Sequence, residues 1–163
     1  MIAGARPRIR ESAAACVPTG GSSRPATTVI VVSDETIDGP SFPLREMLGF
    51  RIDSGHGEST VTLDVDERHI NPHGSVHGAV MFAMVDTAMG GATMSVLDEG
   101  NWCATVDIHT RFLAPCFSGT LMATATVRRA GRRVVHLDGV VVDQAGKEYL
   151  AASGVFAVIP AGD

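Results

Sequence analysis

The sequence predicts an α+β fold in which an antiparallel sheet wraps around one long central helix. The first observation is a run from about Gly78 to Leu97 that holds one charge and no proline, as a largely buried helix does. The second is a set of four segments of strand character that follow this run and are joined by short turns. A helix followed by consecutive strands is typical of an α+β domain, and 163 residues with 45% hydrophobic content suffice for one core.

Three regions are expected along the chain. Residues 1–26 are rich in Ala, Gly, Ser, Pro and Arg without a period, which predicts a disordered tail. Residues 27–42 are expected to form an extended arm, because the strand-like TTVIVV is followed by the breakers Asp-Gly-Pro. The folded domain is expected over residues 43–159, and it begins with a short amphipathic turn or helix that Gly49 ends.

Within the domain the pattern changes from strand to helix and back to strand. Ser59–Val65 alternates as a half-buried strand does, and a loop rich in Asn, Pro and Gly follows it. The helical run comes next and is closed by Gly100. The later strands are expected at Trp102–Phe112, Thr120–Arg129, Val134–Val142 and Glu148–Val158.

Composition excludes several classes of protein. The net charge is -5 without the Lys and Arg clusters that nucleic-acid binding needs, so no nucleic-acid partner is expected. A membrane span is not expected, because Asp86 would lie near the bilayer centre. Three cysteines without CxxC spacing suggest neither disulfides nor a zinc site, which favours the cytoplasm, and an organellar transit peptide remains an alternative for the Arg-bearing start.

The most specific segment is NPHGSVHGAVMFAMVDTAMGGA, residues 71–92, which carries Asn71, then Val76-His77-Gly78, then a helix with Asp86. Together with TVDIHTRFLAP, residues 105–115, it resembles the hotdog-fold acyl-CoA thioesterases, particularly the phenylacetate-pathway type. The resemblance covers about residues 43–159. It implies hydrolysis of acyl-CoA without a cofactor, an obligate homodimer and usually a homotetramer. The family commonly has a second glycine where this chain has Ala79.

Two groups at the start of the helix suit a carbonyl oxygen that gains negative charge. Gly78 opens the helix, so its free N-H and the helix dipole can stabilise an oxyanion; the alternative is a glycine that only permits close packing at the helix start. Asn71 could donate a second hydrogen bond. His77 either orients the loop or substrate, or is a structural hydrogen-bonding residue.

Asp86 is the expected reactive carboxylate, since a lone charge in an apolar helix is costly unless it is paired or employed. It would attack the carbonyl or activate a water, and the alternative is a structural Asp bonded to Thr87 or to a strand. The resemblance places Thr105 where relatives hold the attacking water. Strand alternation groups Thr105 with Asp107 and the residues at 109 and 111, but it leaves open which face meets the site.

The spacing along the helix predicts a shared site. Gly78 and Asp86 lie eight residues apart, about 12 Å along a helix, too far for one carbonyl to touch both. Two protomers with antiparallel helices would place the Gly78 of one opposite the Asp86 of the other.

Two further patterns of charged or metal-ligating residues occur in the sequence. His69, His73 and His77 have a spacing that would line up on a helix, but Pro72 and Gly74 prevent that helix, so no metal is expected. Four arginines flank the Ala130-Gly131 turn and would either grip the phosphates of coenzyme A or form a solvated hairpin tip. They are Arg128, Arg129, Arg132 and Arg133.

Two rival functions remain open on the same fold. One is an enoyl-thioester hydratase or dehydratase, and the other is a non-catalytic acyl-CoA-binding or sensing domain, which would not need a reactive carboxylate. The acyl group is not specified, because a wall that contains Met81, Phe82, Met84 and Met89 adapts to several shapes.

Overall fold

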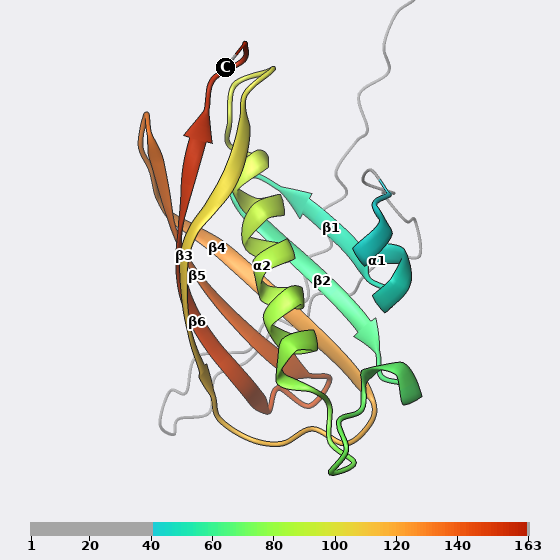
Figure 1. Cartoon of the computed structure of the whole chain (residues 1–163). Helices are drawn as coiled ribbons and strands as arrows, with labels where there is room; N and C mark the ends of the chain where they lie inside the picture. Colours follow the sequence, from blue (N-terminus) through green and yellow to red (C-terminus); the bar gives the residue numbers. More distant parts are fainter. Residues whose placement is uncertain (1–40, 163) are drawn as a thin grey trace, which may run out of the picture. The chain divides into compact units, whose positions relative to one another are not determined.

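Six strands form one antiparallel sheet, and the long helix α2 lies across one of its faces (Figure 1). The computed structural model describes residues 41–162, so the predicted tail at 1–26 and all but the last two residues of the predicted arm lie outside the described residues. The elements are α1 (Pro43–Leu48), β1 (Arg51–Gly55), β2 (Glu58–Asp64), the 3-10 turn η1 (Glu67–His69), α2 (Gly78–Met94), β3 (Trp102–Phe112), β4 (Thr120–Ala130), β5 (Val134–Asp143) and β6 (Glu148–Ile159). The predicted α+β class is confirmed.

The strand order is β1-β2-β4-β5-β6-β3, with every neighbouring pair antiparallel. The first strand after α2 therefore does not pair with the next strand in the chain but with the last one, β6. This order places β3 at an edge of the sheet, next to α2.

Aliphatic and methionine side chains fill the space between α2 and the sheet. Met84, Val85, Ala88 and Met89 of α2 are completely buried, and their spacing of three to four residues puts them on one side of the helix. The residues that they meet on the strands include Val61, Leu63, Leu121, Leu137 and Leu150. The opposite side of α2 is not covered by this sheet, since Phe82 is 39% exposed.

The helix α2 ends three residues before the predicted Leu97, so that boundary was wrong. The hydroxyl of Ser95 donates to the carbonyl of Ala92 at 2.8 Å and accepts the N-H of Gly57 at 2.8 Å. It thereby ties the end of the helix to the turn between β1 and β2. In the described part of the chain, no helix is long and apolar enough to cross a membrane.

The strand β1 was not predicted. Four of its five residues are exposed, so it lacks the alternation of apolar residues that marks a half-buried strand. It is held by antiparallel pairing with β2 across a tight turn, in which His56 and Gly57 both have positive φ, 54° and 83°.

A substitution tests how tightly the helix and sheet pack. A Cβ on Gly139 of β5 would lie 2.7 Å from Cγ2 of Val85 and 2.9 Å from Cε of Met89. Overpacking of this kind costs about 1–3 kcal/mol. Gly139→Ala is therefore expected to lower the free energy of unfolding by about this amount in urea denaturation.

Gly55→Ala is the matched control, because a Cβ there would meet no atom within 4 Å. Equal stability of the two variants would contradict the packing described.

Candidate active site

Asp86 and Thr105 form the most specific polar contact of α2 with the sheet. The hydroxyl of Thr105 donates to Oδ1 of Asp86 at 2.8 Å. Asp86 is half-buried and Thr105 is exposed, so the pair is open to a molecule arriving from solvent. Within residues 41–162 the second carboxylate oxygen, Oδ2, makes no hydrogen bond. Oδ2 of Asp86 and the hydroxyl oxygen of Thr105 are therefore accessible acceptors for a water molecule.

A β-bulge in β3 turns Thr105 toward the helix. Thr105 pairs with Phe156 of β6, but the next pair joins Asp107 to Val155, so Val106 is an extra residue. Beyond the bulge the inward positions shift by one, and Ile108 packs against the core. The expectation that Thr105 shares a face with Asp107 is therefore wrong: Thr105 faces α2 and Asp107 faces away.

The start of α2 carries a backbone donor that has no partner within residues 41–162. His77 is the N-cap: its ring Nδ1 accepts the N-H of Ala79 at 3.0 Å, and its carbonyl accepts that of Val80 at 2.9 Å. The N-H of Gly78 makes no hydrogen bond to any described residue. A free N-H in the first turn of a helix has the helix dipole behind it and is suited to an anionic oxygen.

His77 and Asn71 have clear structural contacts. Because Nδ1 of His77 accepts a hydrogen bond, a neutral ring carries its proton on Nε2, and Nε2 is then a hydrogen-bond donor. The side chain of Asn71 organises the preceding loop: it donates to Oγ of Ser75 at 2.9 Å and accepts the N-H of His73 at 2.8 Å. A contact of either residue with a substrate stays a prediction.

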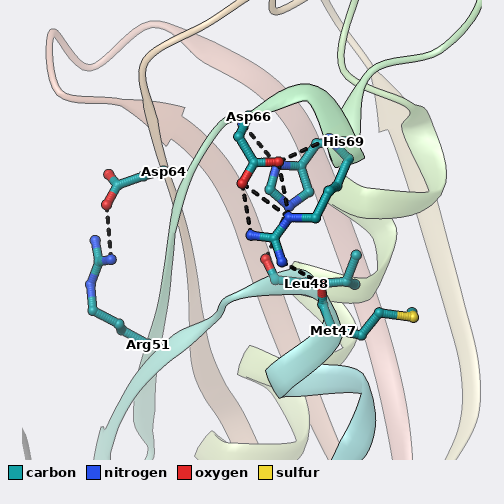
Figure 2. A network of polar contacts seen from close by, with 7 residues as sticks. Met47, Leu48, Arg51, Asp64, Asp66 and His69 are labelled. Carbon is teal, nitrogen blue, oxygen red and sulfur yellow. Dashed lines mark hydrogen bonds and ion pairs between the residues drawn. The ribbon is translucent and has the colours of Figure 1, made fainter.

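A buried histidine fastens this loop to α1 (Figure 2). His69 is 1% exposed, its Nδ1 accepts the N-H of Asp66 at 2.9 Å, and its Nε2 lies 3.0 Å from the carbonyl of Leu48. Side-chain hydrogen bonds from Arg68 lower the pKa of Asp66 to about 2. The carbonyl of His69 in turn accepts the N-H of His77 at 2.8 Å, so the network fixes the residue that caps α2.

The three histidines of the HxxxHxxxH pattern occupy different settings: His69 ends η1, His73 lies in the loop, and His77 caps α2. Across residues 41–162, no group of three or more His, Cys, Asp or Glu side chains is placed to hold a metal ion.

Cys103 lies near the site but is not suited to act as its nucleophile. Its Sγ is 3.8 Å from the carbonyl of Gly90, one helical turn beyond Asp86. Burial, and then the charge of Asp86, raise the pKa of the Cys103 thiol. The thiolate, which is the reactive form, is therefore disfavoured.

The four arginines lie at the far end of the sheet from Gly78 of the same chain. Strand pairing puts Val134 beside Ala157 and Ala157 beside Ala104, near the start of β3. Gly78, by contrast, lies against the ring of Phe112, at the end of β3. All four arginines are exposed, and Nε of Arg128 forms an ion pair with Oδ2 of Asp138 at 2.6 Å.

One residue of the site was missed by the sequence reasoning. The ring of Phe112 lies 3.1 Å from where a Cβ on Gly78 would be. Its sequence context, RFLAP at a strand end, predicts only a strand residue, because contact with a helix 34 positions earlier has no local signal.

Comparison with known proteins gives a consistent result. Residues 73–150 match the family model of the thioesterase superfamily. The acyl-coenzyme A thioesterase PaaI of Escherichia coli is 37% identical over 97 residues, which are 59% of this chain and 67% of that protein. A Haemophilus influenzae relative is 36% identical over 89 residues, 53% of this chain, and the chain spans 64% of that protein's length.

Solved structures agree in fold. The thioesterase HI1161 of Haemophilus influenzae superimposes with a TM-score of 0.70 at 27% identity, over 74% of this chain and 85% of that chain. The Escherichia coli PaaI structure superimposes with a TM-score of 0.67 at 32% identity, over 72% of this chain and 85% of that chain. On the strength of the sequence match, the helix-on-sheet architecture and these superpositions, the chain belongs to the thioesterase superfamily and has the hotdog fold.

Proposed function

We propose that this chain hydrolyses acyl-CoA thioesters to a free acid and CoA, at a site that two protomers share. The observation that carries the proposal is the hydrogen bond from Thr105 to Asp86, which holds a carboxylate at the solvent-accessible side of an otherwise apolar helix. A non-catalytic acyl-CoA-binding domain would not need this arrangement.

The chemistry follows from the free oxygen of Asp86. In the general-base route, Asp86 takes a proton from water and the resulting hydroxide oxygen attacks the thioester carbonyl carbon. In the nucleophilic route, Asp86 itself attacks and forms an anhydride that water later opens. In both routes the carbonyl oxygen becomes an oxyanion, the C-S bond breaks, and the thiolate of CoA leaves and takes up a proton.

Thr105 fits both routes. Since its hydroxyl proton is directed at Asp86, its oxygen lone pairs remain available to accept a hydrogen bond from the attacking water. The oxyanion would be stabilised by the free N-H of Gly78, with the Nε2 proton of His77 or the amide of Asn71 as further donors.

The edge strand supports self-association. β3 has 11 residues and, on the side away from β6, no partner within the described part of the chain. Trp102, Val106 and Phe112 on this strand are each at least 50% exposed. A long, apolar, unpaired edge is normally covered. A second copy that pairs antiparallel along β3 would cover it, giving the proposed homodimer.

The same pairing would bring further groups to the site. The start of β3 in one protomer would lie near the end of β3 in the other, so the arginine hairpin of one chain would approach the Gly78 region of its partner. Arg128, Arg129, Arg132 and Arg133 are accordingly proposed to bind CoA phosphates. The similarity to the acyl-coenzyme A thioesterase PaaI also supports a coenzyme A substrate. We further propose, from the family resemblance, that the dimers associate into a homotetramer and, from the cysteine pattern, that the protein is cytoplasmic.

Replacement of the carboxylate tests the function. Asp86→Asn keeps the shape but cannot accept a proton or form the anhydride, so kcat for thiol release from acyl-CoA is expected to fall by about a thousandfold. Asp107→Asn is the matched control, because Asp107 faces away from α2, and its kcat should stay at the wild-type value. Full thiol release by Asp86→Asn across short, long and aromatic acyl-CoA esters would refute the proposal.

The hydroxyl of Thr105 is tested separately. Thr105→Val keeps the branched shape and removes the hydrogen bond, so kcat is expected to fall about tenfold or more with little change in KM. Thr105→Ser retains the hydroxyl and should keep most of the activity. Wild-type kcat in Thr105→Val together with a loss in Thr105→Ser would show that the site needs the methyl group rather than the hydroxyl, and would contradict the proposed role of this hydrogen bond.

A further inference from the structure

We infer that Phe112 is a positioning residue: its ring sets where the N-H of Gly78 lies and is the reason that position 78 is a glycine. The inference rests on the proposed function, because the N-H of Gly78 matters only if it binds a reacting oxygen.

The ring of Phe112 occupies the space into which a side chain at position 78 would project. The ring atoms Cε1, Cζ and Cδ1 of Phe112 lie 3.1, 3.3 and 3.7 Å from the point that a Cβ on Gly78 would occupy. All three of the nearest atoms to that point belong to this one ring. Any larger residue at position 78 must therefore push the ring, or the first turn of α2, by a few tenths of an ångström.

Backbone geometry does not require glycine at position 78. The described glycines with positive φ are at positions 49, 57, 74, 100, 119, 146 and 162, and Gly78 is not among them. The donor itself does not require glycine either, since every residue except proline has a backbone N-H. The reason for glycine at position 78 is therefore the space that the ring of Phe112 occupies.

The contact completes the support of the helix start. On one side, two backbone hydrogen bonds fix the residues before Gly78. The N-H of His77 donates to the carbonyl of His69 at 2.8 Å, and the N-H of Val76 donates to the carbonyl of Cys116 at 2.7 Å. On the other side, Phe112 pairs with Leu150 of β6, so its backbone is fixed in the sheet. The ring links that fixed strand to Gly78, and oxyanion donors lose their effect when they are misplaced by a fraction of an ångström to about 1 Å.

A double-mutant cycle tests the inference. Gly78→Ala is expected to lower kcat about tenfold with little change in KM, because the donor is displaced. Phe112→Leu frees the space and is expected to lower kcat about threefold. The double variant should have the kcat of Phe112→Leu alone, since leucine leaves room for the new methyl group, instead of the roughly thirtyfold loss that independent effects would give.

Two control variants should both retain wild-type kcat. Phe112→Tyr keeps the ring, and Phe117→Leu changes another exposed phenylalanine. Thermal midpoint and oligomeric state are measured for every protein, so that a kcat change is scored only for folded protein of wild-type assembly. If Gly78→Ala fails to fold, the kcat values of Phe112→Leu and Phe112→Tyr still test the inference, which requires a lower kcat in Phe112→Leu alone.

Multiplicative losses in the cycle, or wild-type kcat in Phe112→Leu, would overturn the inference while the proposed function stands. A wild-type protein that releases no thiol from any acyl-CoA would overturn both.

Discussion

The distance between Gly78 and Asp86 along α2 is the constraint on which the proposed site depends. Eight residues separate Gly78 from Asp86 on α2, a rise of about 12 Å that a rigid helix cannot shorten. The free donor at the helix start and the carboxylate in its middle therefore cannot serve one carbonyl within one chain. Either the two groups have separate roles or a second protomer completes each site. The second arrangement is favoured by the exposed side of α2 and by the edge strand β3, which has β6 as its only partner strand within residues 41–162.

The sheet contributes by placing different residues of β3 along this helix. Thr105 meets Asp86 and Phe112 meets Gly78, so one strand supports both ends of the proposed machinery. The bulge at Val106 makes this possible, because without the extra residue both side chains would not point to the same face. The loop before α2 is held independently by the buried ring of His69, which leaves the helix start little freedom to move.

Much of this was predictable from the sequence, and the exceptions have physical causes. The start of α2 and the four later strands follow from breakers and apolar periodicity that are local in the chain, and Gly78, His77 and Asp86 lie in one short motif. β1 was missed because an exposed edge strand has no apolar face to give it a pattern. The face of the sheet on which Thr105 lies depends on a bulge, which strand alternation does not reveal. The contact of Phe112 with Gly78 joins segments that are distant in the sequence, so it has no local pattern either.

The claim that two protomers share each site is tested most directly by complementation. Gly78→Pro removes the N-H, and its backbone suits the first position of a helix, although its Cβ must also displace the ring of Phe112. Asp86→Ala removes the carboxylate. Each variant alone should be inactive. A purified heterodimer of the two has one site with neither defect, so it should regain about half of the wild-type kcat per dimer. A heterodimer that stays as inactive as its parents, or a wild-type protein that is fully active as a monomer, would contradict the shared site.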